Sequence, residues 1–246
     1  MAIEAMIHTL FTFALLFSSV VHAATFVVKN NCPQTIWPAT LTSGSGQSQL
    51  STTGFQLLSG ASRSVDVPAP WTGRIWARTR CFVDSSSRFS CETGDCASGS
   101  ISCNGAGGIP PATLAEFTLA PNGGMDFYDV SLVDGFNLPA SIATVGGTGE
   151  CQSTACSANV NGVCPTELQV RSGDGSVIGC KSACLAFNEP QYCCTAEFND
   201  PSKCAHSQYS LIFKNQCPQA YSYAYDDKTS TFTCSGSPNY VVTFCP

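Results

Sequence analysis

The chain has few charged side chains, because only 11% of its 246 residues are Asp, Glu, Lys or Arg and its formal net charge is −6. It has no basic stripe that could displace counterions from a phosphate backbone, so we expect no nucleic-acid partner. Histidine is scarce too, and His206 is the one that follows residue 22. A Ser-His-Asp triad would have to use this residue inside a cysteine-bounded loop, and the cysteines lack the paired C-x-x-C spacing of zinc knuckles. Neither a triad nor a metal site is expected.

Long apolar runs are missing after the N-terminus. The stretch from Leu10 to Val21 is apolar, but it is too short and too interrupted by Thr and Ser to span a bilayer. Small residues end it at Ala23, so we predict a signal peptide over residues 1–23 and no transmembrane segment. Cleavage leaves 246 − 23 = 223 residues with a formal charge of 11 − 16 = −5. The chain also lacks an Asn-x-Ser/Thr sequon, so N-glycosylation is not expected.

Cysteine is what the chain has in abundance: 16 residues, all after Ala23. An even and dense set of cysteines predicts disulfides formed in an oxidising compartment, which agrees with a signal peptide. Because every cysteine can pair, no free cysteine nucleophile is expected. Nine of them lie between Cys151 and Cys217, and four lie between Cys81 and Cys103. Both segments are expected to be loop-rich and stabilised covalently.

The rest of the chain predicts a mainly β protein, because short runs rich in Val, Ile, Phe and Tyr are separated by Gly, Pro, Ser and Thr. Helix signals are sparse, and the best is Ser182 to Phe187. Cys-Pro pairs follow the first and last strand candidates, at Cys32 and Cys245. A bridge between them would close 213 residues and remove about 5 kcal/mol of unfolded-state freedom. The predicted strands are Ala24 to Asn30, Arg74 to Thr79, Ala112 to Leu119, Met125 to Leu132 and Tyr240 to Phe244.

One hairpin can be derived residue by residue. Asn122-Gly123 is a strong hairpin signal, and a loop centred between these residues pairs positions whose numbers sum to 245. Glu116 then faces Asp129 on one side of the sheet. On the other side Phe117 faces Tyr128 and Ala115 faces Val130, which gives an apolar face for a core.

Two opposed carboxyls are the pattern that glycoside hydrolysis requires. Their Cβ atoms lie about 5 Å apart, so mutual repulsion should raise one pKa. Arg74 is the natural counterion, and Asp134, Asp226 and Asp227 could extend the acidic surface. The alternative is that Glu116 and Asp129 are solvated or salt-bridged surface acids. Gly107-Gly108 and Gly146-Gly147 lack the strand-to-helix context of a phosphate-binding loop, and no cofactor is expected.

Several segments carry a family resemblance. The stretch CETGDCASGSISC, from Cys91 to Cys103, resembles the signature of the thaumatin-like proteins, pathogenesis-related class five, apart from Ser87 just upstream, where Gly is usual. The resemblance extends over the mature chain and is greatest to the acidic fruit proteins of this class, several of which are allergens. The other matching segments are ATFVVKNNCP, GRIWARTRC, PPATLAEFTLA, YDVSLVDGFNLP, ANVNGVCP, CKSAC, YCCT, CPQAYSYAYDD and TFCP.

The resemblance implies three lobes. A flattened antiparallel β-sandwich would comprise residues 24–78, 105–157 and 218–246, a disulfide-rich lobe with short helices residues 158–217, and a small disulfide loop lobe residues 79–104. An acidic cleft would lie between lobes, lined by Arg74, Glu116, Asp129, Asp134 and Asp227. The implied disulfides are Cys32–Cys245, Cys81–Cys91, Cys96–Cys103, Cys151–Cys234, Cys156–Cys217, Cys164–Cys180, Cys184–Cys193 and Cys194–Cys204.

The function implied is that of a secreted, monomeric plant defence protein that acts on fungi. Its cleft would bind β-1,3-glucan, and any hydrolysis would be weak, with Glu116 as general acid and Asp129 as base or nucleophile. Whether glucan is cut or only held stays open. The alternative is a non-enzymatic antifungal protein that acts on a fungal surface receptor or membrane. Sweet taste is disfavoured, because sweet relatives are rich in lysine and this chain has five lysines and a pI of about 4.9. The chain stops at Pro246, without the extension of vacuolar relatives, so the apoplast is expected.

Overall fold

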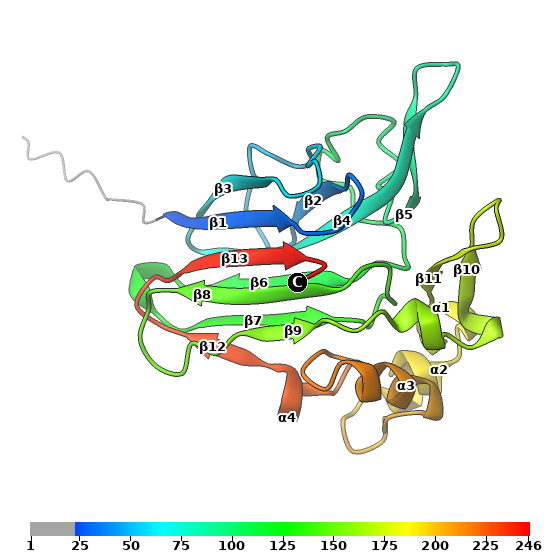
Figure 1. Ribbon diagram of the computed structural model, residues 1–246. Helices are drawn as coiled ribbons and strands as arrows, with labels where there is room; N and C mark the ends of the chain where they lie inside the picture. Colours follow the sequence, from blue (N-terminus) through cyan, green and yellow to red (C-terminus); the bar gives the residue numbers. More distant parts are fainter. Residues whose placement is uncertain (1–22) are drawn as a thin grey trace, which may run out of the picture.

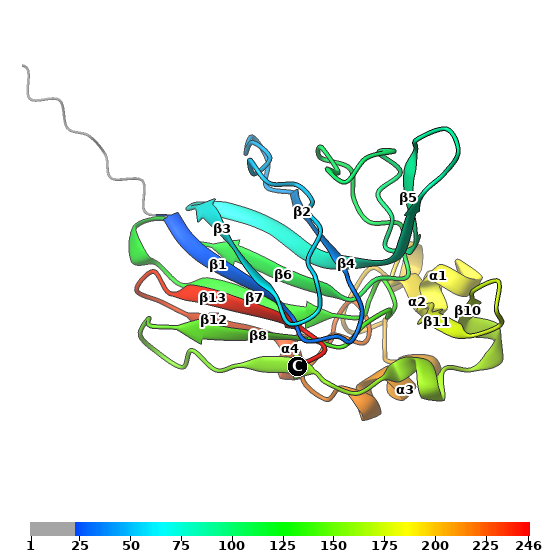
Figure 2. The same cartoon turned by 45° about the horizontal axis from the view of Figure 1, so that its top comes forward.

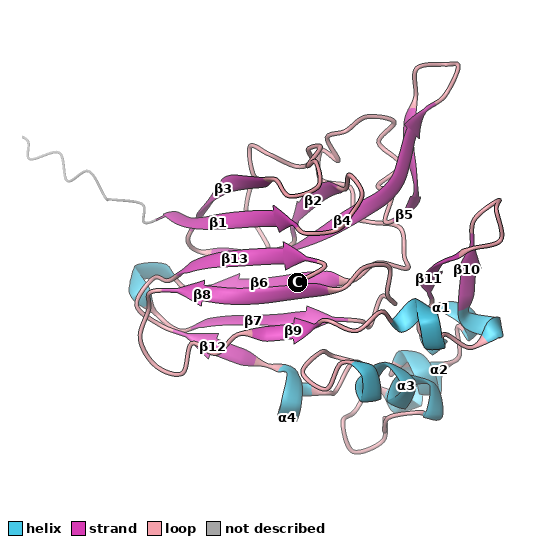
Figure 3. Cartoon of the chain, viewed as in Figure 1, coloured by secondary structure: helices cyan, strands magenta, loops and turns pink. Residues whose placement is uncertain are grey.

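The computed structural model describes residues 23–246, and two packed β-sheets form the body of the protein (Figures 1 and 3). The five-stranded sheet has the order β3-β1-β13-β8-β9, and the six-stranded sheet has the order β12-β7-β6-β4-β2, with β5 paired to β4. The strands are β1 Ala23–Asn30, β2 Trp37–Thr42, β3 Ser62–Pro68, β4 Trp71–Val83, β5 Phe89–Thr93, β6 Leu114–Leu119, β7 Asp126–Ser131, β8 Ala140–Val145, β9 Thr154–Cys156, β10 Gln169–Arg171, β11 Val177–Cys180, β12 Phe232–Cys234 and β13 Asn239–Phe244.

The predicted mainly β fold is confirmed. Each of the five predicted strands is present, although β4 is longer than expected and continues to Val83. One pairing is parallel: β1 lies beside β13, with Phe26 opposite Tyr240, whereas the other strand pairs are antiparallel. The first and last strands of the described chain therefore lie side by side in one sheet. The predicted signal peptide lies outside the described residues except for Ala23, the first residue of β1.

An aromatic cluster fills the space between the two sheets. Phe26 from β1 packs against Trp71 of β4 and Phe117 of β6, with ring centroids 5.9 and 4.6 Å apart. Tyr240 of β13 packs against Phe117 and against Tyr128 of β7 at 5.1 and 5.4 Å. All five side chains are buried. Because neighbouring positions on a strand face opposite sides, this core turns Glu116 and Asp129 to the outer face of the six-stranded sheet.

Helices α1, α2 and α3 gather beyond one end of the strands, as Figure 2 shows. The predicted helix is confirmed as α1, and the side chain of its N-cap residue, Ser182, accepts a hydrogen bond from the Leu185 amide. The longest helix, α3, was not predicted. It begins with a capping box formed by Ser207 and Ser210. The helices are α1 Ala183–Phe187, α2 Pro190–Cys193, α3 Gln208–Gln216 and α4 Asp227–Ser230.

All sixteen cysteines are paired in eight disulfides. The bridges join the same partners that the resemblance implied, and adjacent Cys193 and Cys194 go to different partners. Four bridges lie within the helical and loop segment or tie it to the sheets. The pairs are Cys32–Cys245, Cys81–Cys91, Cys96–Cys103, Cys151–Cys234, Cys156–Cys217, Cys164–Cys180, Cys184–Cys193 and Cys194–Cys204.

Candidate functional site

Three neighbouring strands place a cation and two carboxyls side by side. Arg74 on β4 is directly opposite Glu116 on β6, and Glu116 is directly opposite Asp129 on β7. The register predicted from the sequence is therefore confirmed. The turn is longer than a two-residue Asn-Gly turn, because the last pair is Thr118 with Phe127 and a short 3-10 segment, Pro121–Gly123, occupies the loop.

These side chains line an open cleft of about 310 Å³ on the outer face of the six-stranded sheet. The loop after β7 contributes Asp134, and the segment before α4 contributes Tyr221. Of the five cleft residues expected from the sequence, four line this space, whereas Asp227 is not part of the lining and is hydrogen-bonded to Tyr221. The full lining is Arg74, Leu114, Glu116, Asp129, Ser131, Val133, Asp134, Tyr221 and Ala224.

Arg74 forms ion pairs with two acidic side chains. Its Nη1 atom lies 3.5 Å from Asp134 Oδ2 and 4.0 Å from Glu116 Oε1, and these side chains are about a third exposed. Ion pairs this exposed contribute little to stability. Arg74 acts on the cleft mainly through its charge. One cation faces several carboxyls, so the cleft keeps a net negative charge.

The two opposed carboxyls hold protons more tightly than ordinary acids. Burial raises the pKa of Asp129 to about 8, and the neighbouring Glu116 and Asp227 charges add to the rise. One oxygen of Asp129, Oδ2, is buried without a hydrogen-bond partner in the described structure. Burial also raises the pKa of Glu116, while Arg74 opposes the rise. The two groups interact and titrate as a pair, so at mildly acidic pH the pair retains a proton.

The raised pKa of Asp129 gives a prediction about stability. The folded protein binds this proton more tightly than the unfolded chain does, so its contribution is fully present below the unfolded pKa near 4 and is lost as the pH rises through about 8. Asp129→Asn removes this dependence and should raise the unfolding free energy at pH 8 by about 2 kcal/mol, after a discount for solvent screening. Urea titrations at pH 5 and pH 8 measure it, with exposed Glu197→Gln as control. Equal pH slopes for wild type and Asp129→Asn would contradict the assignment.

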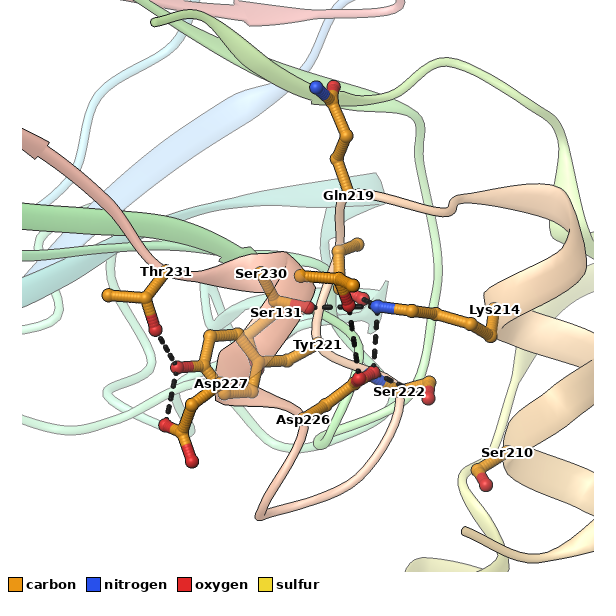
Figure 4. A network of polar contacts seen from close by, with 12 residues as sticks. Ser131, Ser210, Lys214, Gln219, Tyr221, Ser222, Asp226, Asp227, Ser230 and Thr231 are labelled. Atoms are coloured by element: carbon orange, nitrogen blue, oxygen red, sulfur yellow. Dashed lines mark hydrogen bonds and ion pairs between the residues drawn. The ribbon is translucent and has the colours of Figure 1, made fainter. Parts of the chain in front are cut away.

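Tyr221 is the cleft residue that the sequence reasoning missed. Its backbone forms two hydrogen bonds with the end of β7 and the residue after it. The Tyr221 amide donates to the Val130 carbonyl, and the Tyr221 carbonyl accepts from the Leu132 amide. Its hydroxyl donates to Asp227 Oδ1 at 2.8 Å and also contacts Thr231 (Figure 4). Asp227 thus reaches the cleft indirectly, by orienting the Tyr221 ring and by adding negative charge near Asp129.

Asp226 has a different structural role from the expected one. Its Oδ2 atom lies 2.9 Å from Lys214 Nζ and accepts hydrogen bonds from the Ser222 amide and hydroxyl. Lys214 also donates to the Ala220 carbonyl and the Ser230 hydroxyl. This network joins α3 to the segment that carries Tyr221 (Figure 4). The expectation that Asp226 extends the acidic surface is therefore wrong, because Lys214 neutralises it.

This network predicts a measurable loss of stability. Lys214→Ala leaves the largely buried Asp226 carboxylate without its cation, which should lower the unfolding free energy by about 2 kcal/mol. Lys228→Ala, which changes an exposed lysine of α4, is the matched control and should change the unfolding free energy by less than about 0.5 kcal/mol. Equal effects of the two changes in chemical denaturation would show that the pair contributes nothing.

Other chemistries find little support in this part of the chain. Residues 23–246 contain no group of three His, Cys, Asp or Glu side chains arranged for a metal ion. None of the helices described there is long and apolar enough to cross a bilayer. His206 is exposed beside Tyr223 and does not line the cleft.

Comparisons with known proteins agree on one family. The sequence profile of the Thaumatin family matches residues 30–246. The chain is 64% identical over 235 residues to thaumatin-like protein 1a of Malus domestica, covering 96% of this chain and 95% of the relative. It is 62% identical over 225 residues to a Prunus avium protein named glucan endo-1,3-beta-glucosidase, covering 92% and 91%. Pathogenesis-related protein 5 of Arabidopsis thaliana is 52% identical over 240 residues, or 98% of each chain.

A solved structure shares the fold at low sequence identity. It is a laminaripentaose-producing β-1,3-glucanase in complex with laminaritetraose, and it superposes with a TM-score of 0.62. The superposition covers 92% of this chain and 99% of the glucanase at 12% identity. At that identity the likeness concerns the arrangement of the strands.

Proposed function

The chain belongs to the Thaumatin family, and from this premise we propose that it is a secreted, monomeric plant defence protein that binds fungal β-1,3-glucan in the acidic cleft. The observation that carries the proposal is the row of Arg74, Glu116 and Asp129 across three strands, open to solvent on one face. Carboxylates and a guanidinium on such a face supply hydrogen-bond acceptors and donors for sugar hydroxyls. Two relatives support the proposal by name, as a glucanase and as a pathogenesis-related protein. The eight disulfides suit the apoplast.

We further propose that the carboxyl pair hydrolyses the glucan weakly. Hydrolysis needs a protonated carboxyl to assist the leaving oxygen and an ionised carboxyl as base or nucleophile, and a pair that retains one proton provides both. A neutral sugar that covers the cleft removes water from Glu116, whose side chain is 37% exposed, and so raises its pKa further. Asp129 Oδ2 is already buried and gains less. Substrate therefore draws the proton to Glu116, the general acid, and leaves Asp129 ionised as base or nucleophile.

Glucan binding is tested by pull-down with insoluble β-1,3-glucan at pH 5.5, with cellulose as the unrelated polymer. Arg74→Ala should release most of the bound protein, because Arg74 is the cation that organises Glu116 and Asp134. Arg63→Ala, which changes an exposed arginine on β3, should leave binding unchanged. Equal retention of wild type and Arg74→Ala would remove the cleft from the proposal.

The alternative is an antifungal protein that binds a fungal receptor or membrane without hydrolysis. The excess of carboxyls over Arg74 in the cleft favours a cationic or hydroxyl-rich partner in this case as well. The two functions separate in a growth assay, because inhibition of hyphae that persists in a variant without hydrolysis supports the non-enzymatic function.

A further inference from the structure

An apolar stripe leads away from the cleft along β7. Positions 127, 129 and 131 share the outer face of the strand, and Met125 immediately precedes the strand in the same alternation, whereas Asp126, Tyr128 and Val130 are buried. Ser131 and Asp129 line the cleft, and the next two positions on this face are Phe127 and Met125, which are 42% and 51% exposed. Two large apolar side chains thus continue the row that contains a cleft carboxyl.

The neighbours of Phe127 are hydroxyl side chains. Thr118 of β6 is directly opposite Phe127 on one side, and Thr233 of β12 is directly opposite it on the other. Both threonines are at least partly exposed. An aromatic ring with a hydroxyl on each side can cover the apolar C–H face of a pyranose and bond its equatorial hydroxyls.

The spacing agrees with a polymer that leaves the cleft. Side chains two positions apart on a strand are about 7 Å apart, which is the scale of one hexose unit. Phe127 therefore lies about one sugar ring beyond Asp129. The stripe is uncharged, so it complements a neutral glucan better than an ionic ligand.

We propose that Phe127, flanked by Thr118 and Thr233, is an additional glucan subsite that holds a sugar ring outside the acidic cleft and makes affinity depend on chain length. This inference rests on the proposed glucan binding. Phe127 is a binding residue with no part in proton transfer, and it predicts that long β-1,3-linked oligosaccharides bind more tightly than those that fill the cleft alone.

Calorimetry with laminaritriose and laminariheptaose tests the subsite. The heptasaccharide should bind wild type more tightly than the trisaccharide, and Phe127→Ala should weaken the heptasaccharide about fivefold without changing the trisaccharide. Phe127→Trp keeps an aromatic ring at this position, so it should retain the tighter binding of the heptasaccharide. Phe82→Ala, which removes a 54% exposed phenylalanine from the end of β4, is the matched control and should behave as wild type.

The outcomes separate the two proposals. Tight binding of both oligosaccharides by wild type with no effect of Phe127→Ala would overturn the subsite and leave the cleft intact. A wild-type protein that binds neither oligosaccharide would overturn glucan binding and the subsite together. Equal weakening of both oligosaccharides would also overturn the subsite, because it would show that Phe127 acts on the cleft itself.

Discussion

Glu116→Gln and Asp129→Asn are each expected to lower the rate of laminarin hydrolysis about 100-fold to 10,000-fold. Each change keeps the shape of the side chain and removes its ability to ionise, so the pair can no longer hold one proton between two carboxyls. Because the substituted residues face each other on adjacent strands, the double variant should be little slower than the slower single variant. Reducing-end release from soluble laminarin at pH 5.5 measures all three.

The roles within the pair have separate signatures. A substrate with an activated aryl leaving group needs little acid assistance, so Glu116→Gln should retain most of its activity on it. Azide can replace a missing nucleophile or base by direct attack, so Asp129→Asn should recover turnover and give a glycosyl azide of inverted anomeric configuration, whereas any azide product of Glu116→Gln should have the retained configuration. The opposite result would show that Asp129 carries the proton when substrate is bound. Glu197→Gln is the exposed control, and hydrolysis that survives both cleft changes would remove this chemistry from the protein.

The sequence predicted the site where the signal was local. A two-residue period over β6 and β7, joined by Asn122-Gly123, was sufficient to place Glu116 opposite Asp129. The same signal did not predict the conformation of the turn. Pro121 starts a 3-10 segment there, and Asn122 adopts a left-handed conformation with φ 56°. The buried face of the hairpin fixes the register of the two strands. Several turn conformations are compatible with that register, so the turn itself could not be predicted.

The missed features depend on contacts between distant segments. Tyr221 reaches the cleft through backbone bonds to β7, some 90 residues earlier in the chain, and no nearby residue indicates that pairing. Asp226 and Asp227 look equivalent in the sequence, and only the position of Lys214 on α3 separates them. Helix α3 itself has three consecutive apolar residues, Leu211 to Phe213, in place of a spaced apolar face, and its capping box lacks the usual Glu or Gln.

Removing the bridge between the chain ends is expected to be the most destabilising of the disulfide changes. Cys32→Ala with Cys245→Ala opens a loop of 213 residues and should lower the unfolding free energy by about 5 kcal/mol in the chain-entropy estimate. The bridge follows β1 and β13, the parallel pair that joins the first and last strands of one sheet. Pairing two segments this far apart in the chain has a large entropy cost of loop closure, and local interactions do not reduce that cost. The disulfide reduces it, because it keeps the two segments close in the unfolded chain as well.

The matched control is Cys96→Ala with Cys103→Ala. This bridge closes seven residues and should contribute about 2 kcal/mol by the same estimate. Urea unfolding of both double variants, followed by tryptophan fluorescence, measures the difference. Equal losses would show that the bridges act through local packing around Cys32 and Cys96, which are both buried, and that sequence separation is irrelevant. A larger loss for the Cys32–Cys245 bridge would show that it stabilises the protein mainly by limiting the freedom of the unfolded chain, and that the sheet and the aromatic core supporting the cleft depend on this contribution.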